Sequence, residues 1–411
     1  MSTRAWLILL AVGLFAIGTD GYVIAGLLPE MGRDLGVSDS DTGHLVSAFA
    51  LAYALGAPLL AVALGNLPRR PVLISSLTVF AAANVAAALV DSYETMIVIR
   101  VLSGLAAAVF SPGAVAVVPS LVPAEQRGRA LSTVSAGIAV STAVGVPLGT
   151  LIGNAFGWRT TFLVVAALGA LACLGLVLLL PPLPPNPPAD LRTRVAASRT
   201  AGVPSALCVT VLWIAGAFTL LTYLSPVLDE VGNVHGTMLS IWLAIYGLAA
   251  VTGNHLGGRG ADRFPAQRLT VVTTTGLLVA LASFGLLGSL GVGGATGAGW
   301  AIVGLVTWGI FGWAFAPIQS HRLVQLAPES ASVVLSLNSS AIYIGISAGG
   351  FLGSAALAEG GAAAVGWTAA AVELLAVLAS LALLRRSARQ VERIMPTEPK
   401  SSRDSSASLN P

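Results

Sequence analysis

Residues 6–28, WLILLAVGLFAIGTDGYVIAGLL, form an apolar run that contains a single charged side chain, Asp20. Because an α-helix rises about 1.5 Å per residue, a run of this length crosses the roughly 30 Å of hydrocarbon in a bilayer. The run is longer than the apolar core of a typical signal peptide and has no evident cleavage site. We therefore interpret it as a retained transmembrane helix.

The same pattern recurs along the whole chain of 411 residues. Hydrophobic residues make up 55% of the chain and charged residues 9%, whereas a soluble domain carries about 25% charged residues. A soluble fold of this size could not cover its surface with so few charges. The sequence therefore predicts an all-α membrane protein of twelve transmembrane helices in two six-helix bundles. The predicted spans are 6–28, 44–64, 72–90, 96–119, 130–153, 160–180, 205–228, 237–257, 269–289, 299–320, 331–356 and 361–384.

A proline-rich segment divides the chain. Six prolines fall between Pro181 and Pro188, and such a run cannot be α-helical because proline lacks the N–H donor. Three short sequence patterns also recur in the same order at an offset of about 200 residues, which indicates two related halves. We predict a six-helix bundle at 1–180, an extended cytoplasmic linker at 181–204, a second bundle at 205–388 and a disordered cytoplasmic tail at 389–411.

The basic residues indicate the orientation of the spans. If the N-terminus is inside, 18 of the 21 Lys and Arg residues fall in cytoplasmic segments, and the outside loops hold only Arg33 and Arg159. The remaining one, Arg100, lies within a span. This bias satisfies the positive-inside rule. We therefore predict an integral protein of the cytoplasmic membrane with both termini cytoplasmic.

Asp20 and Arg100 are the predicted proton-coupling residues. Asp20 lies deep in the first span, where an ionised carboxylate costs several kcal/mol unless it is paired or hydrated. Burial favours its protonated form, so a proton could bind and leave near neutral pH. Arg100 in the fourth span differs from it in depth by roughly 5 Å, a gap that an arginine side chain can close. The structural alternatives are a fixed ion pair or hydrogen bond for Asp20, and an arginine that extends to the outer interface.

Glu373, in the last span, is a second mid-membrane acid without an obvious basic partner. It is either a second protonation site or a helix-packing contact, and we favour the packing contact. In the fifth span, Gly145, Pro147 and Gly149 predict a kinked helix with one face free of side chains. Such a face permits either ordinary close packing or a hinge and seam between the halves.

The loop between the eighth and ninth spans contains Asp262 between Arg259 and Arg263. This charge cluster could latch the inner side of a transporter and break on opening. The sequence has no phosphate-binding loop of ATPases, no convincing catalytic triad and no zinc motif. We therefore predict no enzyme activity, no cofactor and no metal site, and the net charge of +3 does not indicate a nucleic-acid partner.

The predicted substrate cavity is mostly apolar, with few polar groups. Each of its candidate aromatic residues could equally serve helix packing or an interfacial aromatic belt. The candidates are Phe15, Tyr53, Phe110, Trp213, Tyr223, Trp308, Phe311 and Asn338.

Several segments of the sequence resemble the major facilitator superfamily, in its twelve-span drug:proton antiporter branch. They are GTDGYVIAGLLP at 18–29, RVLSG at 100–104, PAEQRGRA at 123–130, and GVPLG at 145–149 followed by GWR at 157–159. The resemblance implies the major facilitator fold, with a central cavity lined mainly by spans 1, 4, 7 and 10. It also implies that Asp20 and Arg100 take part in proton coupling, and that the span-5 glycines with Pro147 shape the seam between the halves.

These features together predict proton-coupled efflux of small molecules by alternating access. Two alternatives stay open: an uptake carrier or facilitator on the same fold, and a membrane sensor that binds a ligand without transporting it. The predicted partners are a small-molecule substrate, protons and the lipid bilayer, and we expect a monomer. Chloramphenicol-like antibiotics, other hydrophobic drugs, purines and sugars all suit the resemblance.

Overall fold

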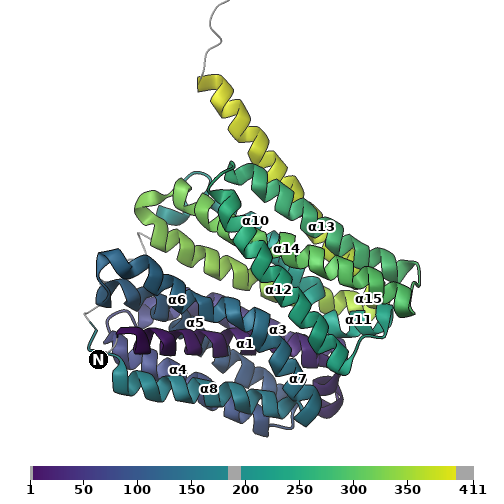
Figure 1. Ribbon diagram of the computed structural model, residues 1–411, viewed down its shortest axis with the longest axis horizontal. Helices are drawn as coiled ribbons and strands as arrows, with labels where there is room; N and C mark the ends of the chain where they lie inside the picture. The colour runs from purple at the N-terminus through teal and green to yellow at the C-terminus, as the bar shows by residue number, and fades with distance from the viewer. Residues whose placement is uncertain (1–2, 184–195, 395–411) are drawn as a thin grey trace, which may run out of the picture.

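Helices make up nearly all of the chain that the structure describes (Figure 1). The structure is a computed structural model, and it describes residues 3–183 and 196–394. Within this part, eleven continuous helices are long and apolar enough to cross a membrane. A bilayer core has no water to satisfy backbone polar groups, so apolar segments of this length are helical.

The first half of the molecule contains the predicted spans one to six, and all six are helical as predicted. The short helices α2 and η1 precede the second and fifth spans. The elements are α1 Thr3–Leu35, α2 Asp39–Thr42, α3 His44–Ala63, α4 Arg69–Leu89, α5 Tyr93–Leu121, η1 Ala124–Gln126, α6 Arg127–Val140, η2 Ser141–Gly145, α7 Val146–Phe156 and α8 Trp158–Leu179.

The second half contains the predicted spans seven to twelve. Its elements are α10 Val203–Leu221, α11 Leu224–Gly232, α12 Gly236–Ala261, α13 Ala266–Ser289, α14 Gly294–Leu326, η3 Pro328–Ser330 and α15 Ala331–Ile394.

The long helix α15 holds two spans. Gly360 and Gly361 inside it have non-helical backbone angles, and Gly361 has a φ of 61°. Glycine adopts this left-handed conformation without the steric cost of a Cβ atom, so the chain reverses there. The described residues therefore contain the twelve spans that the sequence predicts.

The seventh and twelfth spans differ from the prediction at their ends. The seventh is not one helix over 205–228, because the chain breaks between α10 and α11 at Tyr223. Pro226 explains the break, since it has no N–H to donate to the carbonyl of Thr222. Helix α15 continues to Ile394, so residues 389–394, predicted to be disordered, are helical. The rest of the predicted tail, and residues 184–195 of the predicted linker, lie outside the described residues.

The fifth span is distorted at Pro147, as the sequence predicts. The turn η2 is π-helical, and the Val146 N–H donates to the carbonyl of Ser141, five residues earlier. The reason is that Pro147 cannot donate to the carbonyl four residues before it, so the helix widens by one residue there.

The helices of each half pack mainly against one another, and several helix contacts, including one between α2 and α15, join the halves. Helix α3 packs against α15, η2 and α7 pack against α12, and α1 packs against α11. In Figure 1 the ribbons of the two halves lie together at the end that contains α11 and α7 and diverge toward the other end. We name the membrane face with Leu35–Thr42 and Asn233–His235 the closed face, and the face with Arg69 and Asp262 the opposite face.

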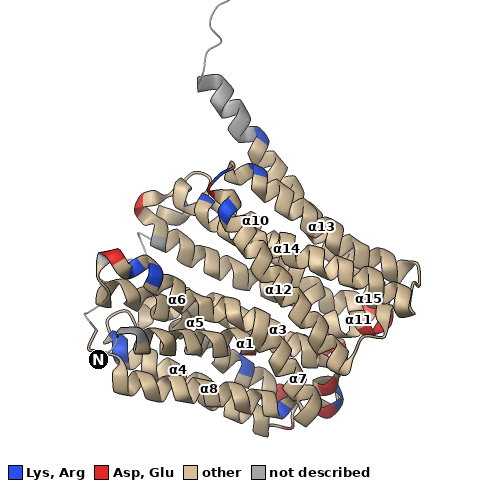
Figure 2. Ribbon diagram, viewed as in Figure 1, with Lys and Arg blue, Asp and Glu red and all other residues tan. Residues whose placement is uncertain are grey.

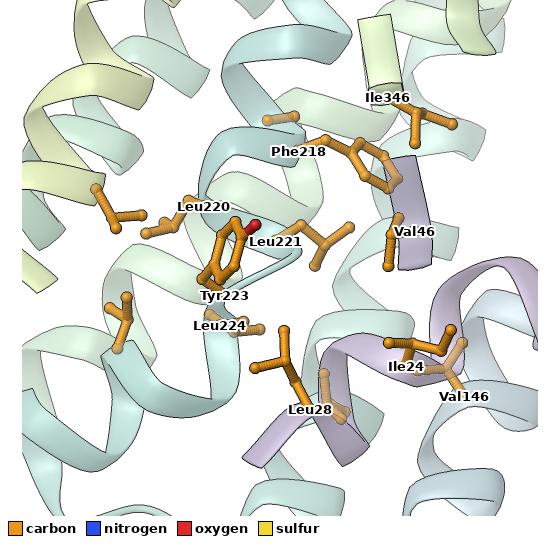
Figure 3. Close-up of a cluster of buried hydrophobic side chains, with 14 of the residues drawn as sticks. Ile24, Leu28, Val46, Val146, Phe218, Leu220, Leu221, Tyr223, Leu224 and Ile346 are labelled. Carbon is orange, nitrogen blue, oxygen red and sulfur yellow. The ribbon is translucent and has the colours of Figure 1, made fainter. Parts of the chain in front are cut away.

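A shared hydrophobic core joins the halves toward the closed face (Figure 3). Ile24 and Leu28 of α1 and Val46 of α3 contribute from the first half. Phe218 and Leu224, on either side of the break between α10 and α11, contribute from the second. A second apolar cluster fills most of the first half, and Tyr343 of α15 packs against it from the second half.

Candidate functional site

The side chains of Asp20 and Arg100 meet in the middle of the first half. Arg100 Nη1 donates to Asp20 Oδ1 at 2.8 Å, and Nη2 donates to the backbone carbonyl of Asp20 at 3.3 Å. The relative exposure of these side chains is 1% for Arg100 and 0% for Asp20. The predicted contact between the first and fourth spans is therefore present, and it is a fully buried ion pair.

One oxygen of this carboxylate has no partner. Asp20 Oδ2 is buried and accepts no hydrogen bond from the residues that the structure describes. Because Oδ2 accepts no hydrogen bond from the described residues, a proton could bind there without breaking one. A proton on Oδ2 would neutralise the carboxylate and leave Arg100 without its counter-charge.

The guanidinium of Arg100 also contacts α3. Its Nε donates to the carbonyl of Leu45 at 3.4 Å, and its central carbon lies 4.5 Å from the centre of the Phe49 ring. Gly104, one turn along α5, makes this approach possible, because a Cβ atom there would collide with the backbone carbonyl of Phe49. The RVLSG segment thus carries both the cation and the glycine that brings α3 beside it.

An aromatic contact between the halves lies next to Phe49. The rings of Tyr53 on α3 and Tyr343 on α15 stack with centres 3.5 Å apart and planes 17° apart. The Phe49 ring is 6.4 Å from Tyr343. The sequence prediction included Tyr53 but missed Tyr343, whose only signal was an aromatic hydroxyl in the middle of the eleventh span.

The glycine face of the fifth span packs closely against α1 of the same half in this conformation. A Cβ atom at Gly145 would collide with Thr19, and one at Gly149 would collide with Val23, both on α1 of the same half. The same span also joins the halves: the π-turn η2, which ends at Gly145, packs against α12 where Gly247 meets Ala143, and α7 packs against α12 as well. Helical spacing predicted the close approach correctly but could not identify the neighbour.

The candidates Phe15 and Asp262 lie in different surroundings. Phe15 is half-buried, and its ring faces the bare face of Gly145 in the fifth span. Asp262 and Arg263 are exposed at the turn after α12. Among the described residues the Asp262 carboxylate forms no ion pair in this conformation, so the latching role of the Arg259, Asp262 and Arg263 cluster stays a prediction.

Three aromatic candidates pack against helices of their own half in this conformation, which favours the alternative of helix packing for them. Phe110 fills the space beside Gly13 of α1. Trp308 packs edge-on against Tyr246, with ring centres 5.4 Å apart. Phe311 covers Gly276 of α13, where a Cβ atom would meet its ring.

The other candidates lie on the inner helices of the second half. Trp213 stacks on Phe315 with ring centres 4.3 Å apart. Asn338 accepts a hydrogen bond at 2.9 Å from Thr210, which itself accepts one from Gln319 at 2.9 Å.

Tyr223 lies at the junction of the halves near the closed face. Its hydroxyl lies 2.9 Å from the carbonyl of Gly350 and 3.3 Å from that of Ser40 in the first half. Tyr223 is therefore positioned to hold the halves together rather than to line a cavity.

Glu373 is the other fully buried acid. Both of its carboxyl oxygens lack a hydrogen-bond partner in the part of the chain that the structure describes. The carboxyl group lies against Gly216 of α10, where a Cβ atom would be 2.9 Å from Oε2. Among the same residues, no group of three or more His, Cys, Asp or Glu side chains could hold a metal ion.

Comparisons with known proteins agree with this architecture. The family model described as Major Facilitator Superfamily matches residues 10–350. The inner membrane transport protein YdhP of Escherichia coli strain K12 is 32% identical over 379 residues, which cover 92% of this chain and 94% of that protein. A chloramphenicol resistance protein of Streptomyces lividans is 36% identical over 269 residues, covering 64% of this chain and 69% of that protein.

A solved structure has the same fold at low sequence identity. It is a bacterial homologue of the human lysosomal transporter Spinster in an inward-facing and occupied conformation. Its TM-score is 0.75 at 19% identity, and the superposition covers 97% of this chain and 100% of that one.

Proposed function

This chain belongs to the major facilitator superfamily, and from that premise we propose that it exports small apolar molecules across the cytoplasmic membrane in exchange for protons. Membership makes it an integral membrane transporter of small molecules rather than an enzyme. The observation that carries the proposal of proton coupling is the buried Asp20–Arg100 pair with its orphaned oxygen. The name of the S. lividans relative supports a drug such as chloramphenicol as the substrate.

The chemistry of the pair suits proton exchange. An isolated charge in a membrane interior is costly, so Asp20 stays ionised only while Arg100 compensates it. Substrate bound in the central region would exclude water and compete with the protonated state of Asp20. Ion pair and protonated acid are then two discrete states, each favoured in one stage of alternating access.

We propose that the closed face is the outside of the cell. Acidic side chains gather there, and most arginines lie at the opposite face (Figure 2). This asymmetry fits the positive-inside rule with both termini cytoplasmic. The conformation described would then face the cytoplasm, ready to take up substrate. The acidic residues at the closed face include Asp34, Asp39, Asp41, Asp91, Glu94, Asp229, Glu230 and Glu359.

The driving force is sufficient for an efflux pump. One proton moving through 100 mV releases about 2.3 kcal/mol. Since about 1.4 kcal/mol corresponds to a tenfold ratio, one proton per substrate supports roughly fifty-fold accumulation.

The test is export from cells and vesicles with Asp20→Asn, which removes the charge but keeps the shape. We expect wild-type protein to protect cells in a growth-inhibition panel that includes chloramphenicol, and Asp20→Asn to lose that protection. Inverted vesicles should accumulate the same compound only under an imposed pH gradient. Glu94→Gln is the matched control, because Glu94 is an exposed acid on α5.

Two outcomes would refute the proposal. If Asp20→Asn kept full export driven by the pH gradient, Asp20 would not be the coupling site. If inverted vesicles lost rather than gained substrate under that gradient, the protein would be an uptake carrier on the same fold.

A further inference from the structure

We propose that Phe49 and Tyr343 transmit the protonation state of Asp20 to the contact between the two halves. This inference deepens the proposed function, because it concerns how the same proton site controls opening at the closed face. The coupling chain consists of Asp20, Arg100, Phe49 and Tyr343, which come from α1, α5, α3 and α15.

The first link joins the carboxylate to α3 through Arg100. The guanidinium shares its donors between Asp20 and the Leu45 carbonyl and places its charge over the Phe49 ring at 4.5 Å. Phe49 also reaches α1, because its ring edge lies 3.6 Å from the position of a Cβ atom at Gly21. One aromatic ring therefore contacts the cation and the helix segment that carries the carboxylate.

The second link crosses between the halves. Phe49 lies 6.4 Å from Tyr343, and Tyr343 stacks on Tyr53, which is one turn further along α3. Closer to the closed face the same two helices approach with the Ser47 side chain packed directly on Gly350, where a Cβ atom would collide with it. The aromatic pair is thus the inner end of the seam between α3 and α15.

Among the charged groups on the helices packed against α1, Arg100 is the one that pairs with Asp20. The helices packed against α1 are α2, α3, α5, α6, η2, α7, α8 and α11. Of their described charged side chains, Arg100 alone is buried. The other titratable and charged groups on these helices are Asp39, Asp41, His44, Tyr53, Tyr93, Glu94, Arg127, Arg129, Arg159, Cys173, Asp229 and Glu230.

A change of charge at Asp20 therefore changes how much of the stabilisation of the Arg100 cation comes from the Phe49 ring. When Asp20 is ionised, the carboxylate holds the guanidinium at its observed position. When Asp20 binds a proton, the Phe49 ring and the Leu45 carbonyl become the main groups that stabilise the cation. A shift of the guanidinium toward α3 moves Phe49 against Tyr343, where the seam begins.

The test measures opening of the closed face by spin labels and needs no substrate. Labels at Asp41→Cys and Thr237→Cys, exposed residues of opposite halves, are placed in a background with Cys173→Ser and Cys208→Ser. We expect the distance between the labels to depend on pH in this background. Phe49→Leu and Tyr343→Leu should abolish that dependence, whereas Phe49→Tyr and Tyr343→Phe, which keep the rings, should retain it.

A role in transport gives a second measurement. We expect Phe49→Leu to lower the maximal rate of proton-driven export roughly tenfold, the scale of a lost cation–π contact. Thermal unfolding in detergent should be close to wild type, because leucine preserves most of the apolar contact. A structural role alone would change the unfolding temperature without changing the pH dependence of the label distance.

Failure of this inference is distinguishable from failure of the proposed function. If wild-type vesicles show proton-driven export but Phe49→Leu keeps both the export rate and the pH-dependent distance, the coupling chain is wrong and the proposed function stands. If the labelled background shows no pH-dependent distance, the coupling chain is also wrong. If wild-type vesicles show no proton-driven export, the proposed function itself fails.

Discussion

Two carboxyl groups lie fully buried in the two halves of this transporter, and their surroundings are opposite. Asp20 in the first half faces the guanidinium of Arg100 at 2.8 Å. Glu373 in the second half faces Gly216, and neither of its oxygens has a partner among the residues described. Both side chains have a relative exposure of 0%.

The difference shows that burial alone does not make a carboxyl group a switch. An unpaired charge in a membrane interior is too costly to persist, so we expect Glu373 to stay neutral. Asp20 has a partner that makes the ionised form tolerable, and protonation of Oδ2 would break no hydrogen bond among the described residues. A carrier of protons needs both states to be accessible, and under the proposed function we expect the paired carboxyl rather than Glu373 to provide them.

Removal of the cation should have the largest effect on stability. We expect Arg100→Leu to destabilise the protein by about 3–5 kcal/mol, because it leaves the Asp20 carboxylate buried without compensation. Asp20→Asn in the Arg100→Leu background should recover most of this loss, since no charge then remains. The measurement is unfolding in detergent at neutral pH, followed for the two single variants and the double variant.

Transport distinguishes stability from coupling in the same variants. The double variant should fold but export nothing under a pH gradient. A double variant as unstable as Arg100→Leu would show that Arg100 acts through packing on Phe49 rather than through charge, and the contrast with Glu373 would disappear.

A methyl group at Gly216 should have the second-largest effect. In Gly216→Ala the new atom would lie 2.9 Å from Glu373 Oε2 and 3.2 Å from the carbonyl of Ala369. We expect a loss of about 1–3 kcal/mol, the cost of overpacking a close helix contact. Glu373→Ala should relieve part of it, which a double-mutant cycle measures as a coupling energy.

Gly258→Ala is the control for this cycle. Gly258 is also helical, in α12, and a Cβ atom there meets nothing within 4 Å. We expect it to leave stability unchanged or raised by up to about 1 kcal/mol, because alanine favours the helix. Equal effects at the two glycines would mean that Glu373 does not pack against Gly216.

The sequence predicted the spans and the ion pair because both follow from the cost of polarity in lipid. Apolar runs of sufficient length must be helical, so the twelve spans could be located, although helices such as α1 and α14 extend six or more residues beyond the predicted ends. Asp20 and Arg100 were conspicuous as charges inside such runs, and the rise per residue placed them near the same depth.

The neighbours of each helix could not be predicted in the same way. Phe110 and Tyr53 are both aromatic residues in apolar runs, yet one packs inside its half and the other stacks across the halves. The spacing of Gly145 and Gly149 indicated a close approach, but α1 rather than the second half fills the space. Such contacts depend on how helices distant in sequence are arranged, which helical periodicity does not encode.

Glu373→Gln should have the smallest effect, and it is the most direct test of the contrast between the two acids. The amide has nearly the shape of the neutral acid, so we expect a stability change of about 1 kcal/mol or less. Proton-driven export and its dependence on pH should match wild type, whereas the equivalent change at Asp20 should abolish export. Both are measured in inverted vesicles, with unfolding in detergent as the check on folding.

The result that would reverse the comparison is specific. If a Glu373→Gln protein folds normally but loses proton-driven export, Glu373 is a second proton carrier. Its carboxyl group would then move away from Gly216 of α10 when it ionises. A change in the number of protons moved per substrate, without a change in maximal rate, would assign one proton to each acid. Unchanged export would leave Arg100 as the feature that turns a buried carboxyl into a switch, since it is the partner that Asp20 has and Glu373 lacks.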